Sequence, residues 1–166
     1  IPIPDGICSR SGNKYACLSN WNYGGVWIQM NFQAESSVVG RDFEKLVEDD
    51  LFNKDYNIIS TNTKISDIGV NVDYIAESSG IREYGEAKGG KFGGKKRPGA
   101  QRTDNVKKAI CNGALLKFKY PQSKYVIYFS APPKSGSSSE EMINTAIEAG
   151  FVDEVRYLEC EFKWEN

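Results

Sequence analysis

The chain has 166 residues, with 22 acidic side chains, 21 basic side chains and no histidine. Its length predicts one domain with a single core, and its content of 40% apolar and 26% charged residues is typical of a globular protein. Without histidine the chain cannot form a Ser-His-Asp or Cys-His catalytic site, and most catalytic zinc sites are excluded. Its chemistry must therefore use carboxylates, lysine, hydroxyls or thiols.

No apolar run reaches the roughly 20 residues of a membrane-spanning helix, and no stretch has the pattern of a signal peptide. We therefore expect no membrane partner and a cytoplasmic, bacterial-type intracellular location. The four cysteines lack CxxC spacing, which argues against a zinc cluster. A disulfide between Cys8 and Cys17 stays open beside the alternative of scattered thiols in a reducing compartment.

The pattern of apolar residues predicts an irregular or hairpin-forming arm at residues 1–20, followed by alternating strands and helices. Strands are expected at 26–33, 56–60, 70–77, 81–88, 124–130 and 154–162, and helices at 40–52, 103–119 and 139–149. A glycine- and lysine-rich loop covers 89–99. This order predicts an α/β fold, a mixed sheet flanked by helices, with parallel crossovers in its second half. We expect a single domain over 1–166, with an arm and strands at 1–39 and the core at 40–166.

The strands at 70–77 and 81–88 predict a hairpin that turns at Ser79-Gly80. Paired residue numbers then sum to 159, so Asp73 lies opposite Glu86 and Asn71 opposite Lys88. The other face of this hairpin is expected to be buried; it contains Val70, Val72, Tyr74, Ala76, Gly85 and Ala87.

Two opposed carboxylates repel each other unless a cation bridges them or one is protonated. In a chain without histidine, the pair Asp73 and Glu86 suits a hard cation, Mg²⁺, for which Mn²⁺ can substitute. Lys88 leaves the same strand face as Glu86. It could orient or help to deprotonate a metal-bound water and offset negative charge in a phosphoryl-transfer transition state. The alternative is a surface hairpin with ordinary charges.

Basic residues are concentrated in one segment. Ten bases and one acid lie between Lys88 and Lys119, which gives this stretch a charge of +9 and the rest of the chain −10. Such a segment fits a surface that binds phosphates, or a solvated lysine-rich loop and helix. The candidate nucleic-acid-binding residues are Lys91, Lys95, Lys96, Arg97, Gln101, Arg102, Lys107 and Lys108. The helical phase of Gln101 places it outside the apolar face of the helix, and a position in the loop is an equal alternative.

Asp73, followed after twelve residues by Glu86-Ala87-Lys88, resembles the D…(D/E)xK signature of the PD-(D/E)XK nuclease superfamily. Residues 40–47 (GRDFEKLV) resemble the G-x-x-F-E-x-x-V helix of its Mrr-like and restriction-endonuclease-like members, and the helix that opens near Gln101 is similar to the basic helix after the motif. The resemblance covers about residues 40–130. Val72 stands where the name of the motif has proline.

The resemblance implies a restriction-endonuclease-like fold and Mg²⁺-dependent hydrolysis of DNA phosphodiester bonds, leaving 5′-phosphate and 3′-hydroxyl ends. Asp73 and Glu86 would be metal ligands, and Lys88 would position or activate the attacking water. Glu44 would be a supporting acid and third ligand, with Glu48 in reserve, because Glu44 borders the apolar stripe of its helix and Glu48 points farther out.

The preferred interpretation is a type II restriction endonuclease that acts on double-stranded DNA. A homodimer is possible, but the sequence does not identify an interface. A repair or recombination nuclease and a nuclease toxin domain are alternatives. Two rivals come from other classes. One is a non-catalytic nucleic-acid-binding domain with the same fold. The other is a carboxylate-pair glycosidase, which would need neither a metal nor a basic loop.

Overall fold

A computed structural model describes the backbone of residues 7–10, 13–16, 21–23, 26–28, 32–90 and 97–158, and within these ranges the side chains from residue 42 onward. The chain divides into two compact units, Ile1–Ser37 and Val38–Asn166. Among the described residues, no helix has the length and apolar content needed to cross a bilayer.

The first unit contains two short antiparallel hairpins. Strand β1 (Ile7–Arg10) pairs with β2 (Asn13–Ala16), and β3 (Trp21–Tyr23) pairs with β4 (Val26–Ile28). The hairpin-forming arm expected at residues 1–20 is present. The strand expected at 26–33 is wrong at its end, because helix α1 (Phe32–Asn53) begins at Phe32. An alternating pattern over its last two residues is too short to distinguish a strand from the first turn of a helix.

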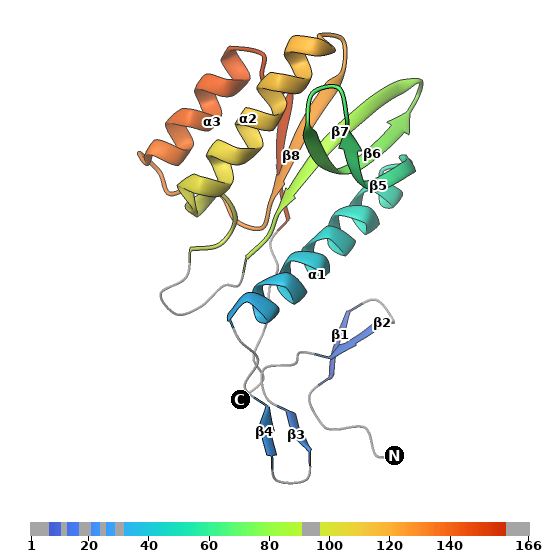
Figure 1. Ribbon diagram of the computed structural model, residues 1–166, viewed down its shortest axis with the longest axis vertical. Helices are drawn as coiled ribbons and strands as arrows, with labels where there is room; N and C mark the ends of the chain where they lie inside the picture. The colour runs from blue at the N-terminus through green and yellow to red at the C-terminus, as the bar shows by residue number, and fades with distance from the viewer. Residues whose placement is uncertain are drawn as a thin grey trace. The chain divides into compact units, whose positions relative to one another are not determined.

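The second unit is built on a five-stranded mixed sheet with the order β5-β6-β7-β8-β9 (Figure 1). Strands β5 (Asn57–Ile65), β6 (Val70–Ser78) and β7 (Ile81–Lys88) are antiparallel neighbours, whereas β7, β8 (Lys124–Phe129) and β9 (Glu154–Tyr157) run parallel. The two parallel connections pass through α2 (Thr103–Lys119) and α3 (Ser138–Glu148). The predicted α/β class with a mixed sheet and two consecutive parallel crossovers is confirmed.

Two apolar clusters cover the two faces of this sheet. One joins Val106 and Leu116 of α2 and Ile143 of α3 to sheet residues that include Ile127. The other joins Phe43, Val47 and Leu51 of α1 to sheet residues that include Tyr128. Because neighbouring residues of a strand point to opposite faces, Ile127 and Tyr128 of β8 mark the α2–α3 face and the α1 face. The unit is therefore a three-layer α/β arrangement.

Most other predicted boundaries are close to the observed ones, but the helix expected at 40–52 begins eight residues earlier, at Phe32. Helix α2 begins and ends where it was expected. In α3 the Ser137 Oγ accepts a hydrogen bond from Glu140 N at 3.4 Å, and Gly150 follows with a φ of 71°, so this helix has a serine N-cap and a terminal glycine. Strand β5 is longer than predicted, because an edge strand with little buried surface has no strong apolar alternation. Residues 159–162 of the last predicted strand lie outside the described residues.

The predicted hairpin register is confirmed from the turn to Tyr74↔Gly85, and the expected pairs Asp73–Glu86 and Asn71–Lys88 lie beyond the end of this ladder. Each pair from Ser78↔Ile81 to Tyr74↔Gly85 sums to 159. The turn residues Ser79 and Gly80 have φ values of 53° and 76°, as in the type I′ turn that suits the twist of a two-residue hairpin.

The expectation that this hairpin buries only one face is wrong. Val70, Val72 and Ile75 belong to the cluster under α2 and α3, whereas Tyr74 and Ala76 belong to the cluster under α1, so the apolar residues expected to share one face are divided between both. Glu83 and Glu86 are also buried, on opposite faces of β7, with residue exposures of 0% and 2%. The hairpin lies inside the sheet, with β5 on one side and β8 on the other, and helices cover both of its faces. Its polar side chains are therefore largely enclosed.

Candidate active site at the ends of β6 and β7

The hairpin brings Asp73, Glu86 and Lys88 into contact; we call these three residues the site cluster. Asp73 lies one residue before Tyr74, where the paired ladder between β6 and β7 ends. Its Oδ2 accepts a hydrogen bond from Ala87 N at 2.7 Å and one from Lys88 Nζ at 3.2 Å. Lys88 Nζ also donates to Glu86 Oε2. The lysine ammonium therefore lies between the two carboxylates that the sequence predicts to be opposed.

The site cluster is partly enclosed, and this changes how its groups ionise. The side chains of Asp73 and Lys88 are each 21% exposed, and that of Glu86 is 3% exposed. Burial raises the pKa of Glu86, and the charge of Lys88 opposes this shift. Burial also opposes the charge on Lys88, but Glu86 and Asp73 outweigh it and the pKa of Lys88 is raised. In this arrangement Lys88 is a cation rather than a base.

Glu44 approaches the site cluster from α1. Burial raises the pKa of its half-buried carboxyl group, and the charge of Asp73 raises it further, while a hydrogen bond to Asn62 and the charge of Lys88 lower it. Asn62 has a left-handed φ of 49°, which asparagine tolerates better than most residues. The structure therefore brings Glu44 within electrostatic reach of two members of the site cluster.

Asn112 of α2 completes the surroundings of Glu86. Its Nδ2 donates to Glu86 Oε1, and the same atom lies 3.5 Å from the main-chain oxygen of Asn71. Asn112 was not predicted from the sequence. The signal available was its position next to Gly113, at the border of the buried stripe of α2, where a polar side chain is half-buried.

The donor chemistry of the site cluster fits a hard divalent cation. Two carboxylates already converge on one ammonium group, and Mg²⁺ is usually bound by one or two carboxylates together with waters and substrate phosphates. Within the described part of the chain, no group of three His, Cys, Asp or Glu side chains has the arrangement of a metal site. The structure thus supplies a pair of carboxylates, and Glu44 as a third ligand stays a prediction.

No family model matches the chain, and no curated protein matches it. Among solved structures, that of Pyrococcus furiosus SfsA in complex with Ca²⁺ is similar, with a TM-score of 0.47 and 20% identity over 91% of this chain and 67% of that chain. A similarity of this size concerns the path of the backbone, and unrelated functions share folds. The function of this chain must therefore be inferred from its own residues.

The candidate nucleic-acid-binding residues are only partly described. Lys91, Lys95 and Lys96 lie outside the described residues. The side chains of Arg97, Arg102, Lys107 and Lys108 are exposed, and none of them forms an ion pair with another described residue. Gln101 belongs to a short 3₁₀ turn (Gly99–Gln101) before α2. This agrees with the alternative that Gln101 lies in the loop before the helix.

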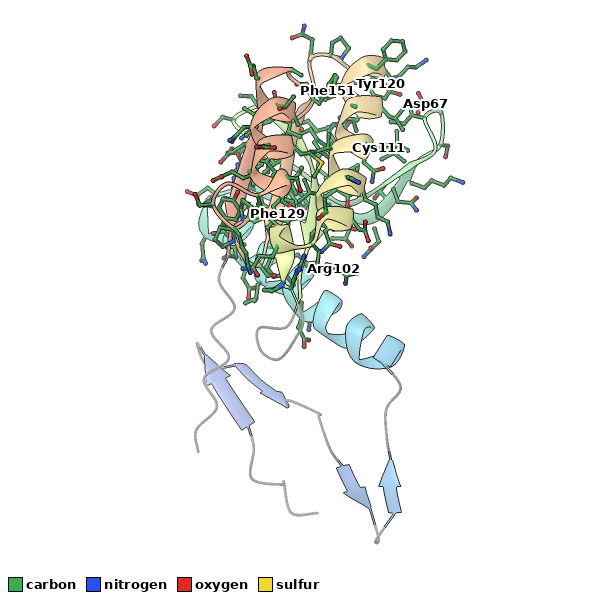
Figure 2. The ribbon with its side chains drawn as sticks, turned by 90° about the vertical axis from the view of Figure 1, so that its left-hand side faces the viewer. Asp67, Arg102, Cys111, Tyr120, Phe129 and Phe151 are labelled. Carbon is green, nitrogen blue, oxygen red and sulfur yellow. The ribbon has the colours of Figure 1, made fainter. Side chains whose placement is uncertain are left out.

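The +9 segment is not a uniform phosphate-facing strip. Lys88 contacts Asp73 and Glu86, and Lys117 donates to Asp153 at 2.8 and 2.9 Å. Arg102 lies at the start of α2 (Figure 2), and Lys108 precedes Asn112 by one helical turn on the same face. Among the described residues of this segment, the exposed positive charge that remains is therefore carried by Arg97, Arg102, Lys107, Lys108 and Lys119.

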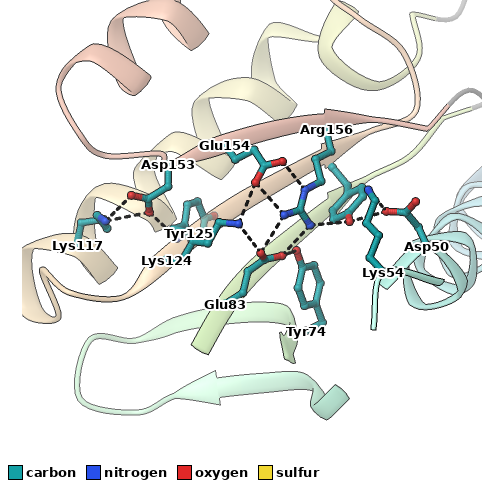
Figure 3. Close-up of polar contacts among 11 residues, drawn as sticks. Asp50, Lys54, Tyr74, Glu83, Lys117, Lys124, Tyr125, Asp153, Glu154 and Arg156 are labelled. Atoms are coloured by element: carbon teal, nitrogen blue, oxygen red, sulfur yellow. Dashed lines mark hydrogen bonds and ion pairs between the residues drawn. The ribbon is translucent and has the colours of Figure 1, made fainter. Parts of the chain in front are cut away.

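A second polar cluster lies on the α1 face of the sheet around the buried carboxylate of Glu83, with Lys124 and Glu154 partly exposed; we call Glu83, Lys124, Glu154 and Arg156 the buried ion cluster, after Glu83 (Figure 3). Glu83 accepts hydrogen bonds from Tyr74 Oη at 2.7 Å and from two Arg156 nitrogens at 3.0 Å, and it pairs with Lys124 at 3.0 Å. Every oxygen of this carboxylate has partners, so the buried ion cluster fastens β6, β7, β8 and β9 together. It was not predicted from the sequence.

Proposed function

We propose that this chain is a metal-dependent nuclease that hydrolyses phosphodiester bonds in DNA. The observation that supports the proposal most directly is the contact of the Lys88 ammonium with both Asp73 and Glu86. These are the residue types, in the order and spacing, for which the chain resembles the PD-(D/E)XK nucleases. The arrangement also lies at the end of the hairpin ladder, where Asp73 and Lys88 reach solvent.

Asp73 and Glu86 would hold Mg²⁺, with Glu44 as the third acid. When bound, the ion would supply Lewis acidity and lower the pKa of a coordinated water. Lys88 would orient the attacking water and stabilise the negative charge that develops on the phosphoryl oxygens, as a positioned ammonium does. The water oxygen forms a bond to phosphorus as the bond from phosphorus to the 3′ oxygen breaks. The products are a 5′-phosphate and a 3′-hydroxyl.

The exposed basic residues would hold the DNA backbone. Arg97, Arg102, Lys107 and Lys108 would contact phosphates, which provides affinity without base recognition. Nothing in these four side chains distinguishes a type II restriction enzyme from a repair nuclease or a toxin domain. The proposal therefore specifies the reaction and the polymer, with the restriction enzyme kept as one subclass.

A plasmid-nicking assay tests the proposal. We expect cleavage with Mg²⁺ or Mn²⁺ and none with EDTA. Glu86→Ala and Lys88→Ala should each lower the rate by about 100-fold or more, the effect of removing one preorganised electrostatic group. Glu77→Ala and Arg82→Ala are matched controls, because they break an acid–base contact (3.7 Å) elsewhere in the same hairpin. Both should keep the rate within about 2-fold, as exposed positions do.

Two outcomes contradict the proposal in different ways. If the protein binds DNA and no cut appears with either metal, it is a non-catalytic nucleic-acid-binding domain. If cleavage occurs and the Glu86 and Lys88 variants keep the full rate, the activity stands and the assignment of these residues is wrong. Sequencing of the cleaved ends from a mixed DNA pool would then distinguish a sequence-specific restriction enzyme from a repair nuclease.

A further inference from the structure

Asn112 is the one described residue of α2 with a hydrogen bond to the site cluster. Glu86 Oε1 accepts its amide, while Glu86 Oε2 accepts the Lys88 ammonium. The two oxygens of this carboxylate thus have different partners, one neutral and one cationic. A neutral amide can fix the direction of a carboxylate without competing for a cation.

The position of Asn112 also spans the gap where the hairpin ladder ends. The last ladder pair is Tyr74↔Gly85, and beyond it β6 and β7 are no longer paired with each other. The Asn112 amide contacts Glu86 on β7 and lies 3.5 Å from the Asn71 oxygen on β6. An amide has two N–H groups, so one side chain can serve both strands.

The backbone of Glu86 is already fixed, which leaves only its side-chain torsions to be determined. Glu86 pairs with Ile127 of β8 in a parallel register. Its side chain, however, has several rotamers, and each of them places the carboxylate differently. The hydrogen bond from Asn112 restricts this rotation and directs Oε2 toward Asp73 and Lys88.

We propose that Asn112 is a positioning residue, which holds Glu86 Oε1 so that Glu86 Oε2 faces the cation. This inference rests on the proposed function, because the cation is the divalent metal of that reaction. Residues that orient metal ligands typically change metal affinity by about 10- to 100-fold when they are removed. A purely structural role, in which Asn112 only fastens α2 to the sheet, would change stability and leave metal affinity unchanged.

The test is a calorimetric titration of the whole chain with Mn²⁺, without DNA. Asn112→Ala and Asn112→Leu both remove the donor, and the leucine keeps the side-chain volume in case the alanine variant fails to fold. We expect both to bind Mn²⁺ about 10- to 100-fold more weakly than the wild type. Asn112→Gln keeps an amide and should recover part of this loss. Melting temperatures are measured alongside and should change by no more than a few degrees.

Cys111→Ala and Cys111→Leu are the matched controls. Cys111 is the neighbouring residue of α2, and it is exposed (Figure 2). The same two side chains are therefore introduced one position away from the proposed contact. Both control variants should bind Mn²⁺ with the wild-type affinity within about 2-fold.

The outcomes separate this inference from the proposed function. Wild-type affinity in the Asn112→Ala and Asn112→Leu variants overturns the inference, as does a loss that the Cys111 variants share. If the Asn112 variants bind Mn²⁺ weakly while the wild type binds it and cleaves no DNA, Asn112 positions the ligand and the proposed function is wrong. If the wild type does not bind Mn²⁺, both are wrong.

Discussion

Strand β7 contains two buried carboxylates only three residues apart, and their surroundings differ. Glu83, on the α1 face, has both oxygens occupied by Tyr74, Lys124 and Arg156. Glu86, on the α2 face, has one amide and one lysine, and that lysine reaches solvent. Removing a partner from a buried, fully paired charge destabilises a fold, whereas a buried charge with an accessible counter-ion can exchange that counter-ion. This contrast fits a structural role for Glu83 and the metal-binding role proposed for Glu86.

The largest expected difference between the two carboxylates is in stability. Glu83→Gln removes the buried counter-ion of Arg156 and Lys124, which keep only the partly exposed Glu154. The change should cost about 3 kcal/mol, the lower end of the range for breaking a buried pair. Glu86→Gln should cost about 1 kcal/mol or less, because Lys88 keeps Asp73 and contact with water. Chemical denaturation of both variants measures this difference.

A second substitution checks the cause of the Glu83 effect. The double variant Glu83→Gln/Arg156→Gln should lose less stability than the sum of the losses in the two single variants. Each single change leaves the other residue without its charged partner. Equal losses of stability for Glu83→Gln and Glu86→Gln would contradict the contrast between the two carboxylates.

Gly85 lies between Glu83 and Glu86 on β7, and an alanine at this position should disturb the surroundings of both carboxylates. A Cβ at Gly85 would lie 2.0 Å from the Tyr74 ring, whose hydroxyl is held by Glu83. Such overpacking typically costs about 1–3 kcal/mol. We expect Gly85→Ala to lower the denaturation midpoint and the plasmid-nicking rate together. In a Tyr74→Leu background the added cost should shrink; a cost that does not shrink would show that the ring is not its cause.

The smallest expected effect is the acid sensitivity of Glu154 in the buried ion cluster. Hydrogen bonds from Arg156 lower the pKa of Glu154 to about 2, and a hydrogen bond from Lys124 contributes to this lowering. Partial burial raises the pKa but has the smaller effect. A carboxyl group whose pKa is lowered by folding stabilises the protein above its unfolded pKa near 4.5, and this contribution is lost as the pH falls toward 2.

Its size should be about 1 kcal/mol, because the side chain is 42% exposed and solvent screens the pair. The measurement is the difference between the unfolding free energies of the wild type and Glu154→Gln, followed from pH 7 to 2. This difference should shrink below pH 4.5. A difference that stays constant over the whole range would contradict the assignment.

Features that depend on local sequence patterns were predicted, whereas contacts between distant segments were not. The register of β6 and β7 followed from strand alternation and the two-residue turn, so the proximity of Asp73, Glu86 and Lys88 could be expected from the sequence alone. The stripe of α1, from Phe43 to Leu51, was likewise visible in the sequence.

The missed features depend on segments far apart in the chain. Glu83 meets Arg156, 73 positions later, only because two parallel crossovers bring β9 beside β8. Asn112 reaches Glu86 only because α2 packs on the face of the sheet that contains Glu86. The same reason explains why the ion pair of Lys117 was not predicted, since its partner, Asp153, lies on the loop before β9. No local periodicity reports such contacts.

The turn at Ser79 and Gly80 has a consequence for how this chain can change during evolution. Strand β7 is held on its other side by β8, so an added turn residue that is not absorbed as a bulge would shift β6 by one position. A shift of one residue exchanges the faces of a strand. Asp73 would then be displaced from Ala87 N and Lys88 Nζ, the two groups that donate hydrogen bonds to it. Insertions and deletions at this turn should therefore be rarer among functional descendants than substitutions of the turn residues themselves.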